Sequence, residues 1–383
     1  MTIIGAGIGG LAAAAALRQR GIAVEVYEQA ERFARVGAGI QQSPNAVKVH
    51  RGLGIEDRLR QVAFAPASSL NRDAGAGRIT NDHPLGKAVE MRYGAPYLTL
   101  HRGDLHEALA SLVPAECVHL GKELVGIDAH GDRVGLTFAD GSEVAAEAVI
   151  GADGVHSLVR DHITTPQPPR FVGRLAYRTT FPASLLRDVE IGPSRTKWWG
   201  EDRHIVIYFV TQARDEVYFT TSQPERADWI TKESWSTKGD LGELQAAFAD
   251  FHPDVRAVLA AAPEVHKWGI FERDPLPRWS RNRVALLGDA CHPMTPYMAS
   301  GAAMALEDAV VLARCLVALD DPAAAFRLYE ATRKPRTSAV QTGSSANTWM
   351  RNETNPDWLY GYDAWTAPLA TALLNPSCTW SIS

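Results

Sequence analysis

The chain has 383 residues, of which 46% are hydrophobic and 22% are charged, so it can bury a large core and form about two domains. The formal net charge of −5 argues against recruitment of nucleic acid or of an anionic membrane. There is no run of about 20 apolar residues and no basic-then-apolar leader, so neither a spanning helix nor a signal peptide is predicted. The four cysteines are scattered without a Cys-x-x-Cys pair, which indicates reduced thiols in a cytoplasmic protein and no metal site.

The first glycines of the chain predict a phosphate-binding turn. Residues 2–4 are typical of a short buried strand, and residues 11–17 are typical of a helix. Gly5-x-Gly7-x-x-Gly10 lies between them. Gly5 permits the tight turn, Gly7 lets the backbone approach a pyrophosphate, and Gly10 lets the helix pack closely on the sheet. The amides at the start of the helix are then directed at the phosphates.

A carboxylate follows where a ribose would be recognised. A second strand is predicted over residues 23–27 and ends at Glu28, 18 positions after Gly10 (28 minus 10). A second tight glycine stretch contains Gly39 and is followed by Gln41. The turn and the acid together predict a dinucleotide site, but they do not distinguish FAD from NAD.

The patterns divide the chain into four segments. Residues 1–170 are predicted as α/β units with a β-rich insertion. Residues 171–274 alternate in strand fashion and are rich in aromatic side chains, which suits a sheet with one packed face and one face that lines a cavity. Residues 275–366 return to α/β character with C-terminal helices, and residues 367–383 form a tail without a clear pattern. The predicted fold class is α/β, a Rossmann-like domain with an inserted β-sheet substrate domain.

Local signals give further elements. A hairpin turn is predicted at residues 139–142, and an amphipathic helix opens near Arg102. Buried strands are predicted over residues 148–150 and 284–287. A long helix is predicted to begin near Gly301.

Motifs in order along the chain carry a family resemblance. After the glycine turn come Arg-x-x-Leu at 102–105, Gly-Ala-Asp-Gly-x-x-Ser-x-x-Arg at 151–160 and Gly-Asp-Ala-x-His-x-x-x-Pro at 288–296. With these motifs the chain resembles the group A FAD-dependent aromatic hydroxylases over nearly its whole length. Lys-Trp-Trp-x-Glu-Asp-Arg-His at 197–204 and the aromatic pattern within 347–363 are most similar to the 6-hydroxynicotinate 3-monooxygenases, relatives of the salicylate hydroxylases.

The resemblance implies a p-hydroxybenzoate hydroxylase-like fold with FAD as cofactor and with NADH or NADPH and O2 as co-substrates. It implies oxygen transfer from a flavin C4a-hydroperoxide to a hydroxylated aromatic or N-heteroaromatic acid resembling 6-hydroxynicotinate, with or without loss of a carboxylate. A hydroxylase of salicylate or another hydroxybenzoate stays open, as does a flavin reductase or oxidase that does not oxygenate. A non-catalytic FAD-binding regulator is disfavoured because Asp153 and Asp289 are intact. A monomer or a homodimer is expected.

The resemblance also implies roles for cofactor-binding residues. Asp289 would accept hydrogen bonds from the ribityl chain, and Arg102 would compensate charge at the pyrophosphate or the ribityl chain. Asp153 would bridge the FAD and nicotinamide sites, although Asp-Gly alone is typical of a simple turn. The amides after Pro296, at the start of the helix, would face the flavin pyrimidine edge. The predicted cofactor-binding residues are Gly5, Gly7, Gly10, Glu28, Gly39, Arg102, Asp153, Asp289, Pro296, Gly301 and Ala302.

His204 and Tyr208 are the candidate catalytic pair. They lie four apart on one predicted strand and therefore point to the same face. The pattern alone favours a buried core histidine and a packing tyrosine, whereas the resemblance implies that both lie in the substrate pocket, where they would orient and deprotonate a ring hydroxyl. The other predicted pocket residues are Gln41, Arg195, Thr221 and Tyr297.

Several of these positions depart from the hydroxynicotinate pattern. Those enzymes carry histidine at the positions of Gln41 and Tyr297 and a smaller residue at the position of Arg195. The family also usually carries glutamine where this chain has Ser300. Arg195 could pair with a substrate carboxylate or lie as a solvated arginine at a strand edge. The reaction class is therefore expected to carry over, while the substrate is not determined.

Overall fold

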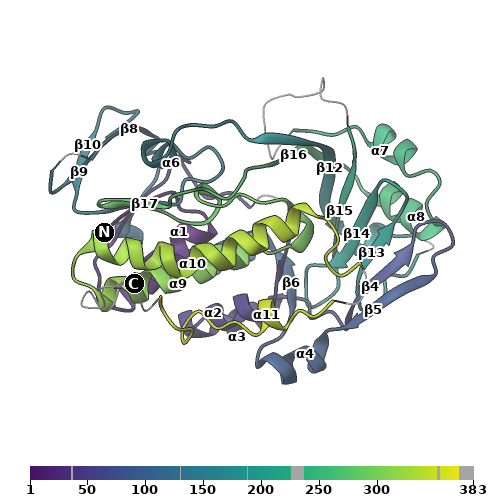
Figure 1. Cartoon of the computed structure of the whole chain (residues 1–383). Helices are drawn as coiled ribbons and strands as arrows, with labels where there is room; N and C mark the ends of the chain where they lie inside the picture. Colours follow the sequence, from purple (N-terminus) through teal and green to yellow (C-terminus); the bar gives the residue numbers. More distant parts are fainter. Residues whose placement is uncertain (36–37, 130, 188, 226–236, 352–353, 371–383) are drawn as a thin grey trace, which may run out of the picture.

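The computed structural model describes the chain except residues 36–37, 130, 188, 226–236, 352–353 and 371–383, so most of the predicted tail lies outside the described residues. The described chain folds into a helix-covered parallel sheet and a larger, mostly antiparallel sheet beside it (Figure 1). Among these residues no helix has the length and apolar character needed to cross a membrane.

The first sheet has six strands in the order β17-β18-β11-β1-β2-β7. Its members are β1 (Thr2–Ile4), β2 (Glu25–Tyr27), β7 (Val118–His119), β11 (Val149–Gly151), β17 (Ser280–Arg281) and β18 (Val284–Leu286). All pair in parallel except β17, which is antiparallel to β18. The strands predicted at the glycine turn, at Glu28 and around residues 148–150 and 284–287 are therefore confirmed as neighbours in one sheet.

Helices cover this sheet, because its strands are apolar on both faces. The almost entirely buried α1 (Ile8–Arg18) packs against α9 (Gly301–Ala318), which in turn packs on α10 (Pro322–Ser345). The predicted long helix at Gly301 is thus confirmed. The remaining helices of this half are α2 (Pro44–Leu53), α3 (Glu56–Val62), α4 (Gly86–Tyr93), α5 (Arg102–Ala110), α6 (Leu158–Ile163) and α11 (Asp357–Tyr360).

Two small sheets complete this half of the molecule. The predicted hairpin is confirmed as part of a three-stranded sheet of β8 (Leu124–Asp128), β9 (Val134–Phe138) and β10 (Glu143–Ala146). A second pair, β3 (Gly39–Gln42) and β6 (Leu98–His101), is antiparallel. This pair carries Gln41 and ends next to Arg102, so it positions two predicted site residues.

The large sheet has seven strands in the order β16-β12-β15-β14-β13-β4-β5. They are β4 (Ser68–Asp73), β5 (Ile79–Pro84), β12 (Arg170–Pro182), β13 (Arg195–Trp199), β14 (His204–Phe209), β15 (Glu216–Pro224) and β16 (His266–Glu272). The predicted division at residue 170 assigned residues 68–84 to the first segment, but the structure places them in this sheet. β4 joins through parallel pairing with β13, a contact between distant segments that local sequence patterns do not reveal.

The two faces of the large sheet differ. One face packs on α7 (Leu241–Ala247) and α8 (Pro253–Ala261) through a core that includes Ile205, Ile207 and Phe219. The opposite face is directed towards the half that contains the six-stranded sheet (Figure 1). This arrangement agrees with the alternation predicted for residues 171–274, because alternate side chains of each strand point to opposite faces of the sheet.

Candidate active site

The glycine turn between β1 and α1 has the geometry of a nucleotide cradle. Gly5 has φ +100°, and a Cβ there would lie 2.3 Å from the oxygen of Ala152. A Cβ at Gly10 would lie 2.0 Å from the oxygen of Gly5. A Cβ at Gly7, in contrast, would meet nothing within 4 Å, so the turn presents open backbone at that point. The cradle therefore has room for a pyrophosphate beside Gly7, at the N-terminus of α1.

Glu28 lies at the carboxyl end of β2, beside this turn. Its Oε2 accepts a hydrogen bond from the amide of Ala6 at 2.7 Å, and its Oε1 accepts one from the amide of Ala30 at 2.9 Å. These bonds fix the carboxylate next to the turn. Each oxygen retains a further lone pair that a ribose hydroxyl can use.

Arg102 and Asp289 are two predicted cofactor-binding residues whose charges interact. Arg102 opens α5 and Asp289 lies in the short helix η4 (Gly288–Ala290). Both side chains are accessible to solvent, yet surrounding protein lowers the pKa of Arg102 and raises the pKa of Asp289. Each charge opposes the shift of the other, so the two groups interact electrostatically. An accessible carboxylate that interacts with an accessible guanidinium suits a ribityl and pyrophosphate chain.

A buried ion cluster holds the segment that carries Asp289. Asp308 Oδ2 accepts hydrogen bonds from the amide of Gly288 at 3.3 Å and from His292 Nε2 at 2.5 Å. Its other oxygen accepts one from Arg333 Nε at 2.8 Å, and Arg333 also lies 2.7 Å from Glu307. Because these groups are fully buried, the hydrogen bonds fix the backbone on both sides of Asp289.

The N-terminus of α9 lies beside the same carboxylate. A Cβ at Gly301 would lie 3.9 Å from Asp289 Oδ1. No side chain caps the helix, because the Ser300 hydroxyl instead donates to the oxygen of Met298 at 2.9 Å. The first amides of the helix, those of Gly301 and Ala302, therefore have no side-chain cap, and they favour negative charge at this helix end. The turn η5 (Pro296–Met298) and Ala299, with φ +50°, precede this helix end.

Asp153 lies beside the glycine turn but has local partners. Its Oδ1 accepts a hydrogen bond from Ser157 Oγ at 2.5 Å, and its Oδ2 accepts one from the amide of Val159 at 3.1 Å. These bonds stabilise the start of α6. The neighbouring Ala152 is the residue against which Gly5 packs. A role for Asp153 between the FAD and nicotinamide sites stays a prediction.

The inner face of the large sheet brings polar and aromatic side chains together. His204 pairs with Trp199 on β13 and with Ser222 on β15, and Tyr208 pairs with Tyr218. Lys197 lies between them, opposite Val206. We call this face the pocket wall; it consists of Arg195, Lys197, Trp199, His204, Val206, Tyr208, Tyr218, Thr220 and Ser222.

Contacts join the pocket wall to the cradle side. The ring of His204 lies 5.9 Å from the ring of Tyr297, whose hydroxyl is 3.2 Å from Ser222 Oγ. Since Tyr297 is in η5, this contact connects the wall with the turn before α9. At the other end a Cβ at Gly39 would lie 3.0 Å from the Tyr208 hydroxyl, so Gly39 is needed for close approach. The structure thus brings the predicted pair to one site with Tyr297.

Gln41 and Arg195 also reach this site. Gln41 Oε1 accepts a hydrogen bond from the Tyr97 hydroxyl at 2.6 Å, and Gln41 also hydrogen-bonds Tyr208. Arg195 is buried, and its Nη1 donates to Ser69 Oγ at 2.6 Å while its Nε lacks a partner among the described residues. The alternative of a solvated arginine at a strand edge is therefore wrong, since β13 is an interior strand.

Burial sets the protonation of the candidate catalytic pair. Burial, reinforced by the positive charges of Arg174 and Arg195, lowers the pKa of His204 well below its usual value, so the imidazole is neutral at neutral pH. Burial raises the pKa of Tyr208 well above its usual value, and the hydrogen bond from Gln41 only partly opposes this. Tyr208 therefore remains a phenol, which can orient a ligand, while neutral His204 can accept a proton.

The prediction for Thr221 needs correction. Thr221 pairs with Ile205, on the face covered by α7 and α8, and its hydroxyl accepts a hydrogen bond from the amide of Tyr177 at 2.9 Å. The adjacent Ser222 lies on the pocket wall instead. Alternation along a strand makes one of two neighbours face the site, but which one depends on register, which the sequence does not show.

Sequence reasoning missed other members of the site. Lys197 lies in a motif of the family resemblance that assigns it no role, and Tyr97 and Tyr218 belong to no motif. Tyr218 had a usable signal, since it lies within an alternating strand. Tyr97 had none, because its contact with Gln41 joins segments 56 positions apart.

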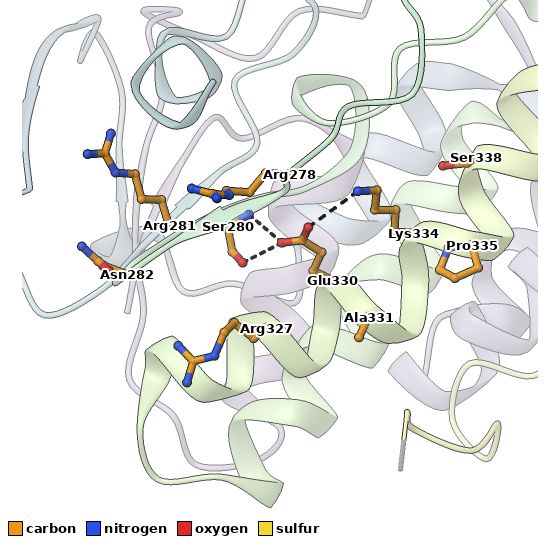
Figure 2. A pocket seen from close by; sticks show the side chains of 10 residues that line it. All are labelled: Arg278, Ser280, Arg281, Asn282, Arg327, Glu330, Ala331, Lys334, Pro335 and Ser338. Carbon is orange, nitrogen blue, oxygen red and sulfur yellow. Dashed lines mark hydrogen bonds and ion pairs between the residues drawn. The ribbon is translucent and has the colours of Figure 1, made fainter. Parts of the chain in front are cut away.

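Another hollow, of about 750 Å³, lies away from these residues between β17 and α10 (Figure 2). Its lining residues are Arg278, Ser280, Arg281, Asn282, Arg327, Glu330, Ala331, Lys334, Pro335 and Ser338. Figure 2 shows Glu330 between Ser280 and Lys334. The Glu330 carboxylate accepts hydrogen bonds from the amide and the hydroxyl of Ser280 at 3.0 and 2.8 Å, and it lies 3.9 Å from Lys334 Nζ. Arg281 pairs with Val284 at the start of β18, whereas Asp289 follows the end of that strand, so this hollow lies at the wrong edge of the sheet for the cradle.

Comparisons with known proteins agree with this geometry. A family model described as an FAD binding domain matches residues 1–344. The chain is 47% identical over 371 residues, 96% of each chain, to a 6-hydroxynicotinate 3-monooxygenase of Bordetella bronchiseptica. It is 41% identical over 341 residues, 89% of this chain and 84% of the relative, to a 3-amino-4-hydroxybenzoate 2-monooxygenase of Streptomyces cremeus. A solved structure of Klebsiella pneumoniae HpxO with FAD and uric acid has a TM-score of 0.80 at 30% identity, covering 93% of this chain and 90% of that one.

These comparisons show that the chain is an FAD-binding flavoprotein, and the cradle, the uncapped helix and the accessible carboxylate suit that cofactor. The chain belongs to the FAD binding domain family, and within it to the FAD-dependent aromatic hydroxylases, which are flavoprotein monooxygenases. The predicted α/β fold, the FAD cofactor and the monooxygenase class are confirmed. The individual site residues remain predictions. Among the described residues no group of three or more His, Cys, Asp or Glu side chains could hold a metal ion.

Proposed function

We propose that this protein hydroxylates a small hydroxylated aromatic or N-heteroaromatic acid that resembles 6-hydroxynicotinate, with NADH or NADPH and O2 as co-substrates. The observation that supports the proposal is the pocket wall, in which the neutral His204, the protonated Tyr208 and the buried Arg195 share one face of the large sheet. The 6-hydroxynicotinate 3-monooxygenase relative supports the substrate class. We also infer a cytoplasmic location from the scattered cysteines.

FAD, when bound, supplies the redox chemistry, which is acceptance of electrons from NADH or NADPH and activation of O2. The protein's own residues bind and orient the substrate. Arg195, with an unpaired Nε, can bind a substrate carboxylate. Tyr208 orients the ring by a hydrogen bond, and His204 accepts the proton of a ring hydroxyl, which raises electron density where oxygen adds. The aromatic side chains of the wall exclude water from the reacting atoms.

A hydroxybenzoate is the second candidate substrate. The departures at Gln41, Arg195 and Tyr297 change the hydrogen-bonding groups that would meet the ring, and a relative at 41% identity is named for an aminohydroxybenzoate. A ring nitrogen and a ring carbon differ in the hydrogen bonds they can make, so these three positions are where the two substrate classes would be separated.

A substrate panel tests the proposal. Purified protein is loaded with FAD and supplied with NADH or NADPH and with hydroxypyridine carboxylates or hydroxybenzoates, while nucleotide oxidation and product mass are recorded. We expect one acid to accelerate NAD(P)H oxidation and to yield one hydroxylated product per nucleotide oxidised. Substrate-stimulated oxidation that yields only hydrogen peroxide with every acid would instead indicate an oxidase, and no stimulation by any acid would contradict the proposed substrate class.

A further inference from the structure

Lys197 is a buried lysine at the centre of the pocket wall. Its side chain is 3% exposed and lies opposite Val206, between the positions of His204 and Tyr208. Its Nζ lies 3.8 Å from the ring centroid of Trp199 and has no hydrogen bond or salt bridge to any residue that the structure describes. A cation–π contact alone replaces little of the hydration that an ammonium group loses on burial.

The groups around Lys197 are cations or neutral. Arg195 on β13, Arg174 on β12 and Arg351 after α10 all act on it with positive charge, and His204 on β14 is neutral. On the neighbouring strand β4, the residue directly opposite Lys197 is Asn71, whose side chain is uncharged. The acid of that strand, Asp73, pairs with Trp199 and uses its Oδ1 to accept the amide of Ala76 at 2.7 Å. No carboxylate of the described residues is therefore placed to neutralise an ammonium at this point.

This environment determines the state of the free amine. Burial, reinforced by the surrounding positive charges, lowers the pKa of Lys197 well below its usual value. An amine in such a site is neutral over a pH range in which ordinary lysines are charged. A negatively charged ligand that reaches the amine reverses the balance, because an opposite charge at close range favours the protonated form.

We propose that Lys197 is the counter-ion for the substrate carboxylate, and that it takes up one proton from solvent when the carboxylate binds. This inference rests on the proposed function and identifies how its acidic substrate would be recognised. In the uptake step the lone pair of Nζ forms an N–H bond to a proton released by a hydronium ion or a buffer acid, whose own bond to hydrogen breaks, and the amine becomes an ammonium. The guanidinium of Arg195 would then share the same carboxylate.

The proposal fixes the sign of the pH dependence. Binding raises the affinity of Lys197 for a proton, so binding of the acid takes up protons. The affinity for the acid is therefore greatest below the pKa of the free amine. It falls tenfold per pH unit as pH rises from that value to the pKa in the complex, provided that the ligand carboxyl stays ionised. An analogue without the carboxylate shows no such dependence.

Calorimetry with matched variants tests this. Binding of 6-hydroxynicotinate, or of the panel acid that binds best, is measured in two buffers of different ionisation enthalpy, with the corresponding analogue lacking the carboxylate as comparison. Lys197→Met keeps the length and apolar stem of the side chain, Lys197→Arg keeps a charge that does not titrate, and Lys238→Met removes a lysine whose side chain is 83% exposed. Melting temperature is recorded for each variant, and Lys197→Met is expected to fold at least as stably as the wild type, because it buries no amine.

We expect about one proton to be taken up by the wild type and by Lys238→Met. Lys197→Met should bind the acid about ten- to hundredfold more weakly, with no uptake, and should bind the analogue without the carboxylate as before. Lys197→Arg should bind the acid without uptake. Unchanged affinity of folded Lys197→Met for the acid, or the same uptake in that variant as in the wild type, would overturn the role of Lys197.

The result also separates this proposal from the proposed function. Binding with proton uptake but without hydroxylation would support the counter-ion role of Lys197 and contradict the proposed hydroxylation. Unchanged hydroxylation by Lys197→Met would support the proposed reaction and contradict the counter-ion role of Lys197. Failure of every acid in the panel to bind the wild type would overturn both.

Discussion

The two faces of the seven-stranded sheet are built from alternate residues of the same strands, yet one face forms a hydrophobic core and the other forms the pocket wall. The outer face packs Ile205, Ile207 and Phe219 against α7 and α8. The inner face buries His204 and Lys197, and this burial lowers the pKa of both side chains. Apolar burial stabilises the fold, whereas burial of these polar groups costs stability and is retained where it serves binding or chemistry. One alternating pattern therefore supplies both the core and the site.

The largest expected effect concerns the inner face. Tyr208→Phe and His204→Ala should retain FAD and fold but lose hydroxylation by about 10²–10⁴-fold, because the group that orients or deprotonates the ring is absent. NAD(P)H oxidation should become uncoupled and release hydrogen peroxide. The product-to-nucleotide ratio and the melting temperature measure the two effects separately. A normal ratio in both variants would make the pair ordinary packing residues.

The outer face should give the converse result. Phe219→Ala removes a fully buried ring from the core under α7 and α8, and we expect a loss of about 3–5 kcal/mol in the free energy of unfolding. Denaturant titration measures this. The protein that remains folded should hydroxylate with normal coupling. Uncoupling in folded Phe219→Ala would show that the two faces are not independent.

The cradle provides an intermediate case. Asp289→Ala removes the acceptor beside the N-terminus of α9, which leaves ribityl hydroxyls unpaired. FAD affinity should fall by about 1–3 kcal/mol, or roughly ten- to hundredfold, and FAD fluorescence on titration of the apoprotein measures it. Asp289→Asn, which keeps one acceptor oxygen, should lose less. If Asp289→Ala retains FAD as the wild type does, the ribityl site lies elsewhere.

The smallest effect tests the register directly. Thr221→Val should cost about 1 kcal/mol of stability, because the amide of Tyr177 loses its acceptor, and should leave kcat/KM unchanged. Ser222→Ala, one position further on the other face, should alter the KM for substrate through the lost contact with Tyr297. Steady-state kinetics on both variants suffices. The reverse pattern would contradict the assignment of the two faces.

Features that depend on a few consecutive residues follow from the amino-acid sequence alone. The turn at Gly5, Gly7 and Gly10 and the segment around Asp289 are recognisable because a tight backbone and a helix N-terminus impose residue types at fixed spacing. Strand alternation likewise puts His204 and Tyr208 on one face, because side chains two or four positions apart along a strand point the same way.

Features that depend on pairing between distant segments arise only in the folded chain. The joining of β4 and β5 to the large sheet, the choice of Ser222 over Thr221, and the burial of Arg195 all follow from strand order and register. The lowered pKa of Lys197 is of the same kind. Its charge is set by what surrounds it in space, and a sequence records neighbours along the chain but not the dielectric or the charges that folding brings to a side chain.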